Sequence, residues 1–250
     1  MPVRRRAGRN GHSHAPSRLD PIPGQERSRA KMAYGRGTRS LVGTRSDRRS
    51  MISDPLEVLA LVGRPLADSG LRWLVGGSVA SSFHGVPRST LDVDLVVEFP
   101  ESAVDQLVSK WSQRFLVDSE MILDAIRRGA SCNLIHLDSA LKVDLFLGVD
   151  DPWIRQELQH PDLVPMRIGD SELVVPFARA EDVLLHKLRW FLDGGSQSDR
   201  QWGDVLGIVR ARGEDLDRAH MERWAVHLGI PQTLIESALR RDDRPIGTHP

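Results

Sequence analysis

Two short motifs carry the side chains best suited to phosphate chemistry. Asp92 and Asp94 stand two residues apart in an apolar run, and on a strand this spacing turns both carboxylates to one side. Two carboxylates on one side repel each other unless a cation lies between them. Gly76-Gly77-Ser78 follows a short apolar run and opens a stretch of small residues, the order strand, glycine turn and helix N-terminus. Free amides at such an end attract phosphate, so the motifs together predict a phosphate site beside a metal site.

A third carboxylate, Asp144, lies inside the apolar segment 141–147. Charges seldom sit in apolar strands without a partner, so we expect Asp144 on a strand next to Asp92 and Asp94, facing the same way. Three carboxylates make an all-oxygen site for Mg²⁺, and two ions held there would lower the pKa of an attacking hydroxyl and neutralise a displaced phosphate. The simpler alternative is that Asp92 and Asp94 only mark an exposed strand edge.

The elements that must position these residues follow from the periodicity of apolar residues. Asp54 and Pro55 predict the cap and first residue of a helix. Strands are expected at 71–75, 90–97, 115–117, 132–137, 141–147, 164–168 and 173–175, and short turns at 138–140 and 169–170 are expected to join the last four into two hairpins. Helices are expected at 55–62, 78–84, 101–115, 120–128, 153–158, 180–192, 199–210, 216–228 and 231–239. The predicted class is α/β (α+β), a small mixed β-sheet lobe with flanking helices over 51–176 followed by a helical lobe over 177–240, with a frayed tail at 241–250.

The charge of the chain is unevenly distributed. Residues 1–50 hold 13 of the 34 Lys and Arg residues but 3 of the 34 Asp and Glu residues, and they lack hydrophobic periodicity. We expect a disordered basic tail, which is either an arm for nucleic acid or a solvated extension upstream of a start at Met51. No apolar run approaches the roughly 18 residues of a membrane span, and a single cysteine favours a reducing, cytoplasmic setting.

The order of motifs resembles the DNA polymerase β-like nucleotidyltransferase superfamily, in which Gly-Gly/Ser precedes Asp-x-Asp and a later carboxylate. More narrowly, residues 76–81, 88–94, 142–146, 180–190 and 199–205 look like bacterial minimal nucleotidyltransferases, which are related to the nucleotidyltransferase toxins of type IV toxin–antitoxin systems. The resemblance covers roughly residues 55–240. It implies a nucleotidyltransferase fold for 51–176, an NTP as donor substrate and two Mg²⁺ ions.

The resemblance also implies roles for individual residues. Gly77 and Ser78, after Gly76, would hold the β- and γ-phosphates; Asp92 and Asp94 would ligate the metals; and Asp144 would complete the catalytic metal site and help activate the acceptor. Lys187 and Asp204 occupy the places of a lysine and an aspartate that line the nucleotide cleft in the toxin group.

Three of the candidate binding residues have a second interpretation. Arg88 precedes the aspartates on a loop expected to face the triphosphate, or it is a surface arginine or one paired with Glu98. Lys187 contacts phosphate or extends along apolar surface to solvent. Asp204 serves the cleft or pairs with Arg200 four residues earlier on one helix.

The hypothesis that explains most of these features is that the chain is an Mg²⁺-dependent nucleotidyltransferase, which moves NMP from an NTP to a hydroxyl of RNA, protein or a small molecule. Acting as a toxin, such an enzyme would have an antitoxin partner. The alternatives are a non-catalytic nucleotide- or RNA-binding protein with the same fold, and a metal-dependent phosphohydrolase.

Overall fold

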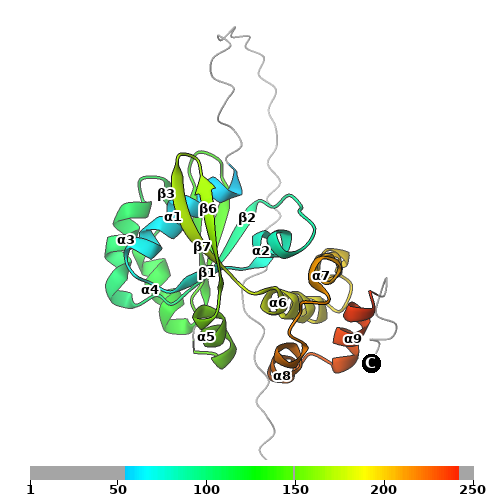
Figure 1. Ribbon diagram of the computed structural model, residues 1–250. Coiled ribbons are helices and arrows are strands. Elements are labelled where there is room, and N and C mark those ends of the chain that lie inside the picture. Colours follow the sequence, from blue (N-terminus) through cyan, green and yellow to red (C-terminus); the bar gives the residue numbers. More distant parts are fainter. Residues whose placement is uncertain (1–53, 149, 242–250) are drawn as a thin grey trace, which may run out of the picture.

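The computed structural model describes residues 54–148 and 150–241. These residues form a mixed β-sheet with helices packed around it, and a group of helices from α6 onward lies beside the sheet (Figure 1). The mixed α/β class is therefore confirmed. The expected tails at 1–50 and 241–250 lie outside the described residues, apart from Arg241, and the division into two lobes at residue 176 stays a prediction.

The described strands join in one seven-stranded sheet of order β3-β4-β5-β2-β1-β7-β6. Two neighbouring pairs, β2 with β5 and β1 with β7, are parallel, and the others are antiparallel. Both hairpins predicted from turn residues, β4–β5 and β6–β7, form. The strands are β1 (Trp73–Val75), β2 (Asp92–Val97), β3 (Phe115–Leu116), β4 (Ser131–His136), β5 (Lys142–Phe146), β6 (Asp162–Ile168) and β7 (Ser171–Phe177).

Capping residues mark the start of α1 and the end of α4. The Asp54 side chain accepts from the amide of Leu56 at the start of α1, and Gly129 ends α4 in the left-handed region, with φ of 57°. None of the described helices is long and apolar enough to cross a membrane. The helices are α1 (Pro55–Asp68), α2 (Gly77–His84), α3 (Val104–Trp111) after a 3₁₀ turn at Glu101–Ala103, α4 (Ser119–Arg128), α5 (Pro152–Gln159), α6 (Ala180–Asp193), α7 (Asp199–Arg212), α8 (Arg218–Leu228) and α9 (Gln232–Arg240).

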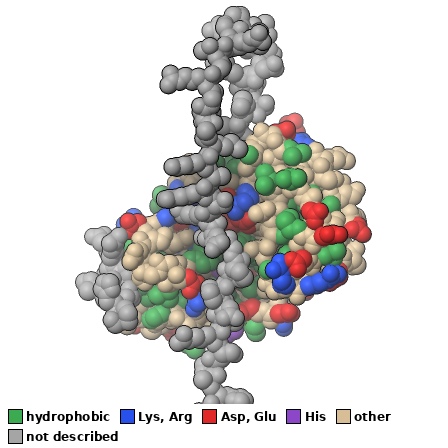
Figure 2. Space-filling view, turned by 180° about the vertical axis from the view of Figure 1, so that it is seen from behind, with side chains coloured by type: hydrophobic (Ala, Val, Ile, Leu, Met, Phe, Trp, Pro, Cys, Tyr) green, Lys and Arg blue, Asp and Glu red, His purple; other side chains and the backbone are tan. Residues whose placement is uncertain are grey.

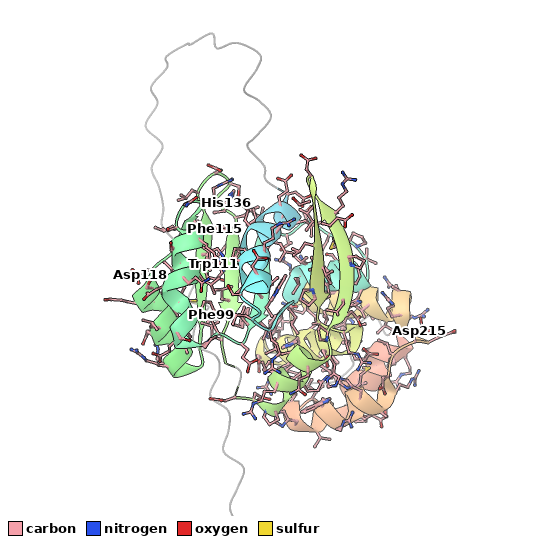
Figure 3. All side chains as sticks on the ribbon, turned by 60° about the vertical axis from the view of Figure 1, so that its left-hand side comes forward. Phe99, Trp111, Phe115, Asp118, His136 and Asp215 are labelled. Atoms are coloured by element: carbon pink, nitrogen blue, oxygen red, sulfur yellow. The ribbon has the colours of Figure 1, made fainter. Side chains whose placement is uncertain are left out.

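The core fills one face of the sheet, where alternate strand residues such as Val93, Leu95 and Val143 are fully buried. Aromatic rings extend this core toward β3. Phe99 and Trp111 meet edge to face with centroids 6.0 Å apart, and the Phe115 and His136 rings lie 5.3 Å apart, so that the four side chains run along the α3 side of the sheet (Figure 3). Because Val93 and Leu95 are buried on this face, the residues that alternate with them point to the opposite face, where a site can form.

Two glycines let the loop after α2 approach α7 closely. A Cβ on Gly85 would lie 2.7 Å from the backbone nitrogen of Ile208, and one on Gly207 would lie 3.2 Å from the backbone nitrogen of Val86. The backbone at 85–86 therefore packs directly against the backbone of α7 at 207–208, without side chains between them. The buried ring of His84, the last residue of α2, places Nε2 2.7 Å from the carbonyl oxygen of Ala178, just before α6. The loop that precedes β2 is thus held against the C-terminal helices.

Candidate active site

The parallel pairing of β2 and β5 brings three aspartates to one face of the sheet. Asp94 lies directly opposite Asp144, and Asp92 lies opposite Lys142. Val93 and Leu95, which alternate with the aspartates, are buried on the other face. A slip of one residue in this register would send the carboxylates into the apolar core, so the core fixes the position of the acidic face.

The Gly76-Gly77-Ser78 turn wraps around Asp94. The amide of Gly76 donates to the backbone carbonyl of Asp94 at 2.9 Å, and the amide of Ser78 lies 3.4 Å from Asp94 Oδ2. Gly77 has a φ of 56°, and a Cβ there would lie 1.8 Å from Asp94 Oδ2. The residue at 77 must therefore be glycine for the carboxylate to keep its place, and the Ser78 amide is engaged by this carboxylate.

Burial raises the pKa of the Asp94 carboxyl, and the facing charge of Asp144 raises it further. The Ser78 amide and the Lys187 ammonium act in the opposite direction but do not cancel the shift. Two facing carboxylates are therefore costly to keep ionised together in the absence of a nearby cation.

A lysine joins the acidic face. The Nζ atom of Lys142 lies 2.7 Å from Asp144 Oδ2, and the side chains are 40% and 19% exposed. Sequence reasoning included Lys142 in a motif but gave it no role. Its spacing of two from Asp144 is the sequence feature that indicates this contact, because it puts both side chains on the same side of β5.

In this conformation the three carboxylates do not converge on one point. Within 54–148 and 150–241, no three His, Cys, Asp or Glu side chains are grouped so as to hold a metal ion. The physical reason is that Asp94 is turned toward the glycine turn and Asp144 toward Lys142. The donor set itself, carboxylate oxygens from two adjacent strands, fits Mg²⁺, because this ion prefers oxygen ligands and needs one or two carboxylates from the protein.

A second cluster joins Arg88, Lys187 and Asp204 across three elements. Arg88 bonds both carboxylate oxygens of Asp204, from Nε at 2.6 Å and from Nη2 at 2.7 Å, and the same Nη2 donates to Ser78 Oγ at 2.6 Å. Lys187 Nζ lies 2.9 Å from Asp204 Oδ2. The cluster therefore links the glycine turn, the loop before β2, α6 and α7.

The local pairings considered from the sequence for this cluster are wrong. Glu98 bonds Arg72 instead of Arg88. Asp204 bonds Arg88 and Lys187, which are both far from it in sequence, instead of Arg200. Helix α7 comes close enough for this because the backbones meet at Gly85 and Gly207.

Two members of the Arg88–Lys187–Asp204 cluster, Lys187 and Asp204, are buried. The Lys187 side chain is 1% exposed, and burial lowers its pKa against the opposing effect of Asp204. Burial alone would raise the pKa of Asp204, but the hydrogen bonds from Arg88 and Lys187 outweigh it and lower the pKa. Asp204 is thus held as a carboxylate that neutralises two cations, which explains why two positive side chains can share one small region.

A cavity of about 900 Å³ opens beside the loop that carries Arg88 and Thr90. Phe83 and Phe177 stack in its wall with ring centroids 4.4 Å apart. This cavity could not be predicted from the sequence, because its walls come from the start of α1, from α2, the loop at 87–91, the β4–β5 turn, β6 and β7. The apolar part of the lining includes Val79, Phe83, Leu91, Leu141, Met166 and Phe177.

No protein-family model and no curated protein matches this chain. Among solved structures, an antigenic nucleotidyltransferase-like protein from Paracoccidioides brasiliensis is similar with 17% identity and a TM-score of 0.46, over 77% of this chain and 95% of that one. The antibiotic-resistance factor ANT(2″)-Ia is similar with 12% identity and a TM-score of 0.33, over 73% and 88%.

A tRNA-processing enzyme in an apo form is similar with 16% identity and a TM-score of 0.31, over 77% of this chain and 54% of that one. All three TM-scores lie below 0.5.

Proposed function

We propose that this chain is an Mg²⁺-dependent nucleotidyltransferase that moves NMP from an NTP to an acceptor hydroxyl and releases pyrophosphate. The observation that carries the proposal is the facing pair of Asp94 and Asp144, with Asp92 on the same face, beside a turn where Gly77 leaves no room for a side chain. In the proposal, the aspartates form a cation site and the glycine turn forms a phosphate site next to it. Charge neutralisation and positioning supply most of the catalysis in phosphoryl transfer.

In this proposal Asp92, Asp94 and Asp144 would hold two Mg²⁺ ions, which when bound would neutralise phosphate charge and activate the attacking hydroxyl. The acceptor oxygen attacks the α-phosphorus, the bond from that phosphorus to the β-phosphate oxygen breaks, and Asp144 takes up the hydroxyl proton. The pyrophosphate leaves with the electrons of the broken bond. The products are therefore the NMP ester of the acceptor, pyrophosphate and a protonated Asp144.

Gly76, Gly77, Ser78 and Arg88 bind the β- and γ-phosphates in the proposed complex. Arg88 is held by Asp204 and already donates to the Ser78 hydroxyl, so its guanidinium is oriented before the nucleotide arrives. Lys187 reaches the same region through Asp204. Arranging these donors in advance lowers the entropy cost of binding a triphosphate.

The acceptor class is the open part of the proposal. On the uncovered part of the face seen in Figure 2, Lys and Arg side chains lie among Asp and Glu instead of gathering into a basic stripe. RNA binding without specificity relies on such a stripe, so this face does not favour RNA over a protein or a small-molecule hydroxyl. A toxin-type enzyme with an antitoxin partner belongs to the same proposal and rests on the motif resemblance alone.

The test is transfer of label from each α-labelled NTP to total cell RNA and to total cell protein. Asp92→Asn, Asp94→Asn and Asp144→Asn should each abolish labelling and pyrophosphate release. The matched control is Asp118→Asn, because Asp118 lies at the start of α4, away from the site (Figure 3), and asparagine also caps helices. Labelling that persists in Asp94→Asn would refute the mechanism.

Two other outcomes would replace the proposal. Release of orthophosphate in place of pyrophosphate would make the protein a phosphohydrolase. NTP binding that is indifferent to Mg²⁺, with no transfer, would favour a non-catalytic nucleotide-binding protein.

A further inference from the structure

The Lys142 side chain belongs to the same face of the sheet as the three aspartates. It is opposite Asp92 across the β2–β5 pair and two residues before Asp144 on its own strand, so all four ionisable side chains, Asp94 included, share one side of the sheet. Its Nζ atom makes the 2.7 Å ion pair with Asp144. A lysine side chain is therefore present where three carboxyl groups are brought together.

The other cations described near this face are engaged elsewhere. Arg88 and Lys187 both bond Asp204, whose charge they share. The Asp94–Asp144 pair is thus left with Lys142 as the directly bonded positive side chain among the described residues. Since like charges in adjacent strands are destabilising, this contact has a function that an ordinary surface ion pair lacks.

We propose that Lys142 is a built-in counter-ion of the carboxylate face, and that a divalent cation must displace its ammonium from Asp144 in order to bind. This inference rests on the proposed function, because it assigns the cation to the same three aspartates. It explains why the carboxylates do not converge in the present conformation: Asp144 faces the ammonium. The Lys142 side chain is 40% exposed, so its flexible stem can leave the face without disturbing the core.

The inference predicts that metal affinity is limited by competition with Lys142. In the full chain without nucleotide, Lys142→Met should bind Mn²⁺ about tenfold more tightly than the wild type, because the competing charge is gone. Lys142→Arg keeps the charge and should stay within about twofold of the wild type. The matched control is Lys110→Met, which removes the same charge from an exposed position on α3.

Free Mn²⁺ measured by electron paramagnetic resonance gives the affinity directly, without any assay of transfer. A thermal unfolding series gives a second measurement: Lys142→Met should unfold at a lower temperature than the wild type without metal, and Mn²⁺ should raise its unfolding temperature by more. Lys142→Gln serves the same purpose if the methionine variant does not fold.

Equal Mn²⁺ affinity in the wild type and in Lys142→Met would overturn the counter-ion inference while leaving the proposed function in place. An equal gain in Lys110→Met would overturn it too, because the effect would then be one of net charge. Absence of Mn²⁺ binding in every variant would overturn both the inference and the metal site of the proposed function.

Discussion

Replacing Gly77 by alanine should disable the acidic face while leaving most of the fold intact. Two separate costs follow from the structure. The left-handed φ of 56° costs an L-residue about 1–2 kcal/mol. The new Cβ would also lie 1.8 Å from Asp94 Oδ2 and 2.7 Å from Asp94 Cβ, so rotation of the carboxylate alone cannot relieve the contact and the backbone must shift.

The expected loss of stability is about 1–2 kcal/mol or more, which for a chain of this size lowers the unfolding temperature by roughly 2–8 °C. The effect on transfer should be larger than this, because a carboxylate displaced by about 1 Å costs on the order of 100-fold in rate. Gly76→Ala is the matched control: a Cβ there has no atom within 4 Å, and the φ of −114° is open to any residue.

Thermal unfolding and the rate of NMP transfer should be measured on both variants and the wild type. Gly77→Ala should be folded, less stable and nearly inactive, whereas Gly76→Ala should match the wild type in thermal unfolding. If Gly77→Ala transferred nucleotide within threefold of the wild-type rate, the close approach of the turn to Asp94 would not be a requirement of the site. If the two variants lost stability equally, the argument from the positive φ would be wrong.

Two further predictions concern buried ionisable groups. Asp204→Asn should lower the free energy of unfolding by about 3–5 kcal/mol, because Lys187, at 1% exposure, keeps a buried charge without its carboxylate. Adding Lys187→Met should recover much of this loss in urea unfolding, and a double variant less stable than Asp204→Asn would contradict the pairing argument. Burial lowers the pKa of His84, so the unfolded chain takes up a proton that the native state resists. Stability should therefore be complete above about pH 7 and fall as the pH drops through the ordinary histidine range, about 6.5, toward the lowered pKa. His84→Gln should flatten that slope, and an unchanged slope would assign the pH dependence to other groups.

The helices and strands could be predicted where their signals are local. The cap at Asp54, the stop at Gly129 and the turn residues of both hairpins lie within a few positions of the elements that they define. The predicted helix over 101–115 was too long, because its first turn is 3₁₀ and α3 ends at Trp111. The parallel pairing of β2 with β5 has no local signal, since it joins strands separated by two helices and two other strands.

The same distinction explains the candidate site. Alternation in β2 was enough to put Asp92 and Asp94 on one face, whereas the contact of Arg88 with Asp204 spans 116 positions in sequence. The partner of Arg88 is not a sequence neighbour, because the backbone approach at Gly85 and Gly207 brings the distant carboxylate of Asp204 closer.

The carboxylate of Asp204, shared by Arg88 and Lys187, has an evolutionary consequence. A related chain with no acidic residue at position 204 has no use for a buried ammonium at position 187, since that charge would lose its partner. We therefore expect positions 187 and 204 to change together among relatives, and position 88 to follow less strictly because its side chain can reach solvent. Exchanging α7 between such relatives should succeed when α6 is exchanged with it.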